Sequence, residues 1–287
     1  MIIMLTTAKC ACATCEKVLP IREMIRVEKN NRGGANAYLC NYHARMQEDY
    51  FYEHDRFSGK AKSHGFTYGI ELESMADSER ARMELQSRDF VATSDCTVRI
   101  EYKSPIFHGL NALSKDCTTI QILNANRELD TIHANCGTHL NIGHVDYINA
   151  QTVDYIRRFC HSLFIPLSNY MTAHPAEVER LFGRSLNRWA EPYTEWSSAD
   201  DHTNFINLQH NNRIEFRVCK FLNAKQYINA TKCATEMMTA IINNFIKHFN
   251  DQPKDNRRYS NKTEYRKHKA EMTAAKLVKI FKKYAEA

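Results

Sequence analysis

Alternation of apolar and polar residues marks four short segments in the middle of the chain as β-strands: residues 66–74, 97–103, 136–143 and 213–219. Three longer segments carry apolar residues at three- and four-residue spacing instead: residues 110–126, 150–171 and 225–249. That spacing is typical of helices that bury one face. The pattern therefore predicts an α+β body in which helices cover one face of a sheet.

The two ends of the chain differ from this body. At the N-terminus, three cysteines precede an alternating segment (18–27), a turn at 30–34 and a short strand that ends at Leu39. The C-terminal residues are polar until an amphipathic helix at about 263–284, whose apolar stripe is formed by Leu277, Ile280, Phe281 and Tyr284. We therefore divide the chain into a zinc-finger-like module (1–55), a linker (56–65), the body (66–250) and a basic helical tail (251–287).

Composition excludes several classes of protein. The 287 residues are 43% hydrophobic and 25% charged, with 9 Gly and 6 Pro, which excludes collagen-like and wholly disordered chains. The net charge of +6 comes from the tail, which contains eleven basic and five acidic residues. The rest of the chain is therefore neutral and gives no electrostatic argument for nucleic acid. Ten cysteines are too few for a disulfide scaffold, and no apolar run reaches membrane-spanning length. We expect a cytoplasmic protein without a membrane partner.

A zinc site is predicted near the N-terminus. Cys12 and Cys15 form one pair of ligands, and Cys40 and His43 form a second pair. Two such pairs supply the four ligands of a closed tetrahedral Zn²⁺ site, which is structural because no coordination position stays open. Cys10 is an alternative to Cys12, and the opposing interpretation is that these are unrelated free thiols.

Polar residues two apart in the predicted strands point to one face of the sheet. They are Glu71 and Glu73, His139 and Asn141, Glu215 and Arg217, together with Glu101. A solvated face of an antiparallel sheet shows the same alternation without any function. Taken together, however, Glu, His, Asn and Arg are the side chains that hold divalent cations and phosphates, which favours a site.

Four motifs in order then resemble the amidoligase family of carboxylate–amine ligases, which belongs to the glutamine synthetase-like superfamily. The matching residues are Gly69, Glu71 and Glu73; Asp95, Glu101, Ser104 and Pro105; Cys136, Gly137 and His139; and Ile214, Glu215, Phe216 and Arg217. The resemblance covers about residues 66–249. Asn141 departs from it, because a second His is common at that position.

This resemblance implies a curved antiparallel sheet that cups ATP and metal ions, with helices on its outer face. It implies ATP-dependent formation of an amide or peptide bond, in which a substrate carboxylate attacks the γ-phosphate and an amine displaces phosphate from the acyl phosphate. Mg²⁺ would be held by Glu71, Glu73, Glu101 and Glu215. His139 would assist a metal or a phosphate, and Arg217 would face the transferring phosphoryl group. Asn141, Arg188, Asn204 and Asn207 are further candidates for nucleotide or substrate contacts.

A second hypothesis is a zinc-finger protein that binds nucleic acid and has a non-catalytic body. Its support is the finger and the tail, where phosphate and stacking contacts would come from Arg257, Arg258, Tyr259, Tyr265, Arg266 and Lys267. A packed amphipathic helix with lysines at its edge is the favoured interpretation of that tail. The expected partners are thus small-molecule or peptide carboxylates and amines rather than nucleic acid.

Overall fold

The computed structural model describes residues 65–94, 97–144, 147–199, 201–248 and 262–286, and the backbone of four short N-terminal strands. These strands are β1 (Lys9–Ala11), β2 (Val18–Pro20), β3 (Met24–Val27) and β4 (Ala37–Cys40). β1 pairs with β2 and β3 pairs with β4, both antiparallel. β3 and β4 flank the predicted turn at 30–34, which confirms a strand on each side of it, whereas the alternating segment predicted at 18–27 contains two strands, β2 and β3.

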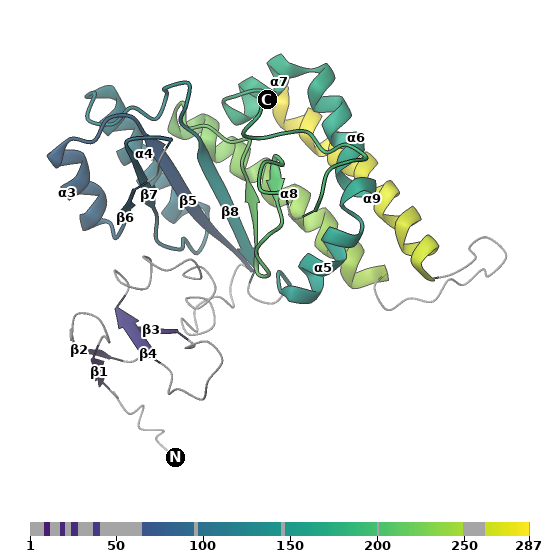
Figure 1. Cartoon of the computed structure of the whole chain (residues 1–287), viewed down its shortest axis with the longest axis horizontal. Coiled ribbons are helices and arrows are strands. Elements are labelled where there is room, and N and C mark those ends of the chain that lie inside the picture. Colours follow the sequence, from purple (N-terminus) through teal and green to yellow (C-terminus); the bar gives the residue numbers. More distant parts are fainter. Residues whose placement is uncertain are drawn as a thin grey trace.

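The body is built on one six-stranded antiparallel sheet in the order β6-β7-β5-β8-β10-β9. Its strands are β5 (Phe66–Ser74), β6 (Val91–Thr93), β7 (Ile100–Lys103), β8 (Thr138–His144), β9 (Ile206–Asn207) and β10 (Arg213–Phe216). β5 and β8 are the longest and lie side by side at the centre (Figure 1). The two edges of the sheet are different strands, so the sheet is open.

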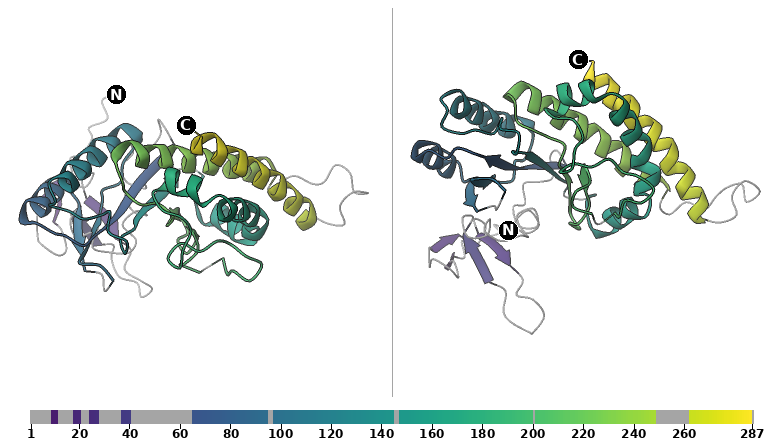
Figure 2. Two further views of the ribbon diagram at one scale, coloured as in Figure 1. Left: turned by 90° about the horizontal axis from the view of Figure 1, so that it is seen from above. Right: turned by 45° about the horizontal axis from the view of Figure 1, so that its top comes forward.

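Helices cover one face of this sheet, as Figure 2 shows from above. The helices of the described residues are α3 (Glu79–Ser87), α4 (Leu110–Ala125), α5 (Ala150–Arg158), α6 (Cys160–Ala173), α7 (Pro175–Phe182), α8 (Ala224–His248) and α9 (Lys262–Ala285). Of these, α6, α7 and α9 pack mainly on one another and on α8. Ile70, Leu72, Leu140 and Ile214 point into this layer and belong to one buried hydrophobic cluster with residues of α4 and α8. Because side chains alternate along a strand, the residues between them are left on the opposite face.

The predicted elements are mostly found. β5 has the bounds that the alternation predicts, and the helices expected at 110–126 and 225–249 are α4 and α8. The strand expected at 97–103 begins only at Ile100. The single helix expected at 150–171 is two, which meet at Phe159, where ψ is 15°. Both helices bury apolar residues at helical spacing, so periodicity could not reveal a break one residue long.

Four short elements of the body were not predicted. β6 and β9 have three and two residues, too few for alternation to be visible. The two helices did carry local signals in the sequence. Ser78 caps α3 by accepting a hydrogen bond from the Ala81 N–H at 3.0 Å. α7 begins at Pro175 and is followed by Gly183, whose φ of 87° caps the helix after Phe182.

α9 packs against α6 and α8 as an integral part of the described fold (Figure 1). Leu277, Ile280 and Phe281 are buried in the same cluster as the sheet, and Tyr284 packs against that cluster, which confirms the predicted apolar stripe. Lys269 and Lys282 extend over tyrosine rings. No helix in the described part of the chain is both long and apolar enough to span a bilayer.

Candidate active site

The face of the sheet opposite Ile70, Leu72 and Leu140 brings the predicted polar residues into two adjacent rows. Strand register places Glu71 opposite Lys103 on β7 and opposite His139 on β8. In the next row Asn141 lies opposite Gly69 on β5 and opposite Glu215 on β10, and Glu215 lies opposite Asn207 on β9. Residues paired in this way share a face, so the register alone gathers side chains from five strands.

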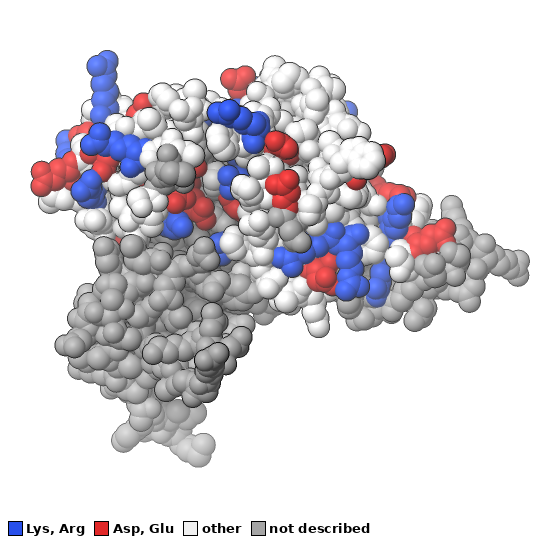
Figure 3. Space-filling view, in the orientation of Figure 1, with Lys and Arg blue, Asp and Glu red and all other residues white. Residues whose placement is uncertain are grey.

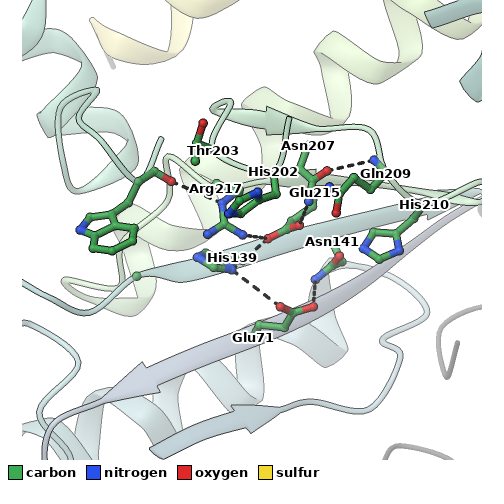
Figure 4. A network of polar contacts seen from close by, with 12 residues as sticks. Glu71, His139, Asn141, His202, Thr203, Asn207, Gln209, His210, Glu215 and Arg217 are labelled. Carbon is green, nitrogen blue, oxygen red and sulfur yellow. Dashed lines mark hydrogen bonds and ion pairs between the residues drawn. The ribbon is translucent and has the colours of Figure 1, made fainter. Parts of the chain in front are cut away.

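Glu71, His139 and Glu215 form a compact cluster within these rows (Figure 4). His139 Nδ1 lies 2.9 Å from Glu215 Oε1 and 3.7 Å from Glu71 Oε2. One nitrogen or oxygen atom from each residue lies within 4.8 Å of the other two. His139 and Glu215 are almost completely buried, so the cluster is held in a fixed environment.

Hydrogen bonds from neighbouring side chains orient the two carboxylates. Asn141 Nδ2 donates to Glu71 Oε1 at 3.0 Å, and Asn207 Nδ2 donates to Glu215 Oε2 at 2.6 Å. Arg217 Nη1 donates to Glu215 Oε1 at 3.0 Å, and its Nε donates to the backbone oxygen of Trp189 at 3.3 Å. Each carboxylate therefore has one oxygen anchored by an amide, which fixes the direction of the other.

The pKa of each of the three residues in the cluster depends on the charges of the other two. Burial alone would lower the pKa of His139, but the carboxylates of Glu215 and Glu71 raise it to about 9. Burial likewise opposes ionisation of Glu71 and Glu215, yet contact with His139 outweighs it and lowers the pKa of both carboxyls. Two carboxylates and a protonated imidazole thus stabilise one another in a site shielded from water.

Glu73 and Glu101 lie one row further along β5 and β7, opposite each other. Glu73 Oε1 lies 3.7 Å from His139 Nε2, and Glu73 also accepts a hydrogen bond from the Gly137 N–H. Glu101 accepts from Thr93 Oγ1 at 3.0 Å. Burial and the charge of Glu71 raise the pKa of Glu101, which indicates that this edge concentrates negative charge.

Arg184 completes this end of the site and was not predicted. It donates to the backbone oxygen of Arg217, and burial lowers its pKa against the opposing charge of Glu73. Gly137 makes room for it, because a Cβ there would lie 3.0 Å from His139 Nε2 and 3.3 Å from Arg184 Nη1. Arg184 lies in the loop between α7 and β9, which has no periodicity, so no pattern in the sequence marks it.

The arrangement fits a hard divalent cation. His139 Nδ1 is buried and, despite its closeness to Glu215, has no well-aligned hydrogen bond among the described residues. One imidazole nitrogen and two carboxylates from three strands are a donor set that such a cation accepts. Because the metal would take the nitrogen lone pair, its binding would release the proton from His139.

The other predicted site residues have mixed outcomes. Asn207 lies beside Glu215, as described above, whereas Arg188 is exposed and stacks over Trp189, 4.8 Å from the ring centroid. Asn204 is buried and donates to the backbone oxygen of Ser198. The zinc prediction and Asp95 lie outside the described residues: Cys12, Cys15 and His43 entirely, and Cys40 except for its backbone in β4. The zinc site stays a prediction.

Acidic and basic side chains are interspersed over the described part of the face seen in Figure 3. Of the residues expected to contact nucleic acid, Tyr265, Arg266 and Lys267 lie in the packed helix α9, and the other three lie outside the described residues. This surface gives no particular support to a nucleic-acid partner.

No protein-family model matches the chain, and no curated protein sequence matches it. Among solved structures, a GmaS–ADP complex in conformation 1 is similar over 80% of this chain and 69% of the other, with 9% identity and a TM-score of 0.39. A novel glutamine synthase homologue is similar over 92% and 76%, with 10% identity and a TM-score of 0.37. Both neighbours are glutamine synthetase-like proteins. Similarity this distant carries no argument about activity, which must come from the site.

Proposed function

We propose that the protein is an ATP-dependent carboxylate–amine ligase that forms an amide or peptide bond through an acyl phosphate. The observation that carries the proposal is the joining of Glu71, His139 and Glu215 into one cluster, with Arg217 bound to Glu215. Three of the four motifs that resemble the amidoligase family contribute these four residues. A solvated sheet face would leave them separated and open to water.

Mg²⁺ is the cation that fits this chemistry, with Glu71, His139 and Glu215 as its ligands and Glu73 and Glu101 close by. When bound, it would neutralise the negative charge of the ATP phosphates. The buried carboxylates keep the position of that charge fixed, so little reorganisation is needed as the reaction proceeds.

Arg217 is suited to the transferring phosphoryl group. Its guanidinium is anchored by Glu215 and by the backbone of Trp189, yet its side chain keeps 16% exposure and can meet an anionic ligand. In the first step an oxygen of the substrate carboxylate bonds to the γ-phosphorus and the bond to ADP breaks. In the second, the amine nitrogen bonds to the acyl carbon, phosphate leaves, and the ammonium proton passes to solvent or a base.

Trapping with hydroxylamine tests this proposal without knowledge of the natural amine. Hydroxylamine attacks an acyl phosphate as an amine does and yields a hydroxamate, which ferric iron colours. We expect ADP and hydroxamate to form together when the protein, ATP, Mg²⁺ and a panel of amino-acid and peptide carboxylates are mixed. Glu71→Gln is the control that should form neither. A wild-type protein that releases no more ADP than this variant, with every acid in the panel, would refute the ligase.

A further inference from the structure

Arg213 is linked to Glu71 through one intermediate residue, Asn141 (Figure 4 shows Asn141, Glu71 and His210). Arg213 lies at the start of β10, opposite Gly143 and on the same face of the sheet as Glu215, and its side chain is buried. Its Nε donates to Asn141 Oδ1 at 3.0 Å, and its Nη2 lies 3.0 Å from His210 Nε2. Asn141 Nδ2 in turn donates to Glu71 Oε1 at 3.0 Å.

The chemistry of these groups allows only one orientation of the Asn141 amide. Arg213 is a donor only, so it requires the amide oxygen, and the Glu71 carboxylate is an acceptor only, so it requires the amide nitrogen. Asn141 therefore presents no free ligand oxygen toward Glu71. It holds Glu71 Oε1, while Glu71 Oε2 is the oxygen that faces His139 at 3.7 Å.

We infer that Arg213 is a positioning residue of the cation site, which acts through Asn141 to set the direction of the Glu71 carboxylate. The inference rests on the cation site of the proposed function. Groups that orient metal ligands from behind are worth about 10- to 100-fold in metal affinity. Asn141, at a position where the resemblance leads one to expect a second His, thus supports a ligand instead of acting as one.

A purely electrostatic role for Arg213 predicts the opposite sign. Its positive charge lowers the pKa of Glu71 and repels a cation bound there. If charge were its only contribution, removing Arg213 would tighten metal binding. If it positions Glu71, both removal and replacement by Lys weaken binding, because the single ammonium of Lys cannot reproduce the fixed planar donors of Arg.

Mn²⁺ binding to the full-length chain without nucleotide decides between these roles, with free Mn²⁺ measured by electron paramagnetic resonance. We expect Arg213→Lys and Arg213→Met each to raise the Kd for Mn²⁺ by about 10-fold or more. Arg157→Lys is the matched control. Arg157 donates hydrogen bonds to the backbone oxygens of Leu208 and Gln209, which lie in the loop before β10 and outside the cluster. Its Kd should stay within about twofold of wild type.

Asn141→Ala tests the same connection at its intermediate residue, even where an Arg213 variant folds poorly. It should weaken Mn²⁺ binding to a similar degree, and the Arg213→Lys/Asn141→Ala double variant should lose little more than either single variant, because both break one pathway. Unchanged or tighter binding in Arg213→Lys or Asn141→Ala, or fully additive losses, would overturn the inference.

The two proposals fail separately. If these variants lose Mn²⁺ affinity but the wild-type protein makes no hydroxamate, the positioning role stands and the ligase activity falls. If hydroxamate forms and the variants bind Mn²⁺ normally, only the role of Arg213 falls. A wild-type protein that binds no Mn²⁺ would remove the cation site and with it this inference.

Discussion

Glu71 and Leu72 are neighbours in β5 but belong to opposite faces of the same sheet. Leu72 is completely buried among side chains that share only their apolar character, and many similar shapes could fill its place. Glu71 instead has identified partner atoms at defined distances: Asn141 Nδ2 at 3.0 Å and His139 Nδ1 at 3.7 Å. One face is specified by volume and the other by individual atoms.

The difference separates stability from chemistry. Burial of the apolar face stabilises the fold, whereas the polar face gathers carboxylates that repel one another, as the raised pKa of Glu101 beside Glu71 indicates. His139, Arg213 and Arg217 offset part of this repulsion, and a bound divalent cation would offset it further. Substitutions on the two faces should therefore affect different measurements.

The largest effect is expected for Glu71→Gln. It removes one ligand charge but keeps the shape and size of the side chain and its ability to form hydrogen bonds, so the fold should persist. We expect Mn²⁺ affinity to be lost and ATP-dependent turnover to fall by about 10³-fold, the scale of losing a preorganised electrostatic contact. Thermal unfolding of the variant is the control. A Glu71→Gln protein that turns over at the wild-type rate would show that the polar face is a sheet face without catalytic function.

Leu72→Ala should have the reverse profile. It leaves a cavity beneath the sheet and should lower the free energy of unfolding by about 2–5 kcal/mol, measured by urea denaturation. Mn²⁺ affinity per folded molecule should not change, since Leu72 points away from the cluster. If metal affinity falls as much as stability, the two faces are not independent.

Arg217→Lys tests the polar face at its ligand-facing side. A point charge cannot replace the bidentate fork, so the turnover number should fall by about 10²-fold while the melting temperature barely changes. Steady-state kinetics and thermal melts, measured on the same preparation, distinguish the two roles. An early melt with normal turnover would assign Arg217 to a structural ion pair with Glu215.

Asp77 is a polar exception at the edge of the apolar face, where it accepts a hydrogen bond from Tyr102 Oη at 2.5 Å. Burial would raise its pKa, but hydrogen bonds from Arg82 and Tyr102 outweigh this and lower it. The ionised form thus stabilises the fold above the unfolded pKa of about 3.9, and this contribution is lost as pH falls through the lower folded pKa. Asp77→Asn should cost about 1 kcal/mol at pH 7. The stability difference from wild type should shrink in acid; a difference independent of pH would contradict this assignment.

The smallest signal is optical. The chain has 2 Trp, and Trp189 is joined to Arg217 through its backbone oxygen, whereas the Trp196 side chain is 92% exposed. In a Trp196→Phe protein, Mg²⁺-ATP should therefore change the fluorescence of Trp189. The same titration of Trp189→Phe, with Trp196 as the reporter, should give a weaker change. Equal responses would argue against ligand binding beside Arg217.

The sequence predicted a substantial part of both fold and site because the signals are local. Alternation identified β5 with its bounds, and the same alternation placed Glu71, His139 and Glu215 on one face of their strands. Arg184 escaped prediction because it lies in a loop, and no spacing relates it to Glu73. Arg213 shares the two-residue spacing of Glu215, so the signal was present, but its role depends on a contact with Asn141 from another strand.

By itself the sequence determined which residues face the helices and which face away, since the two-residue repeat of a strand and the 3.6-residue repeat of a helix are properties of the local backbone. It could not determine which strands are neighbours. The order β6-β7-β5-β8-β10-β9 brings β5, β8 and β10 together across long stretches of chain, and this order alone converts separate carboxylates into a cluster. That choice depends on how the whole apolar face packs against α4 and α8, and the packing exists only in the folded molecule.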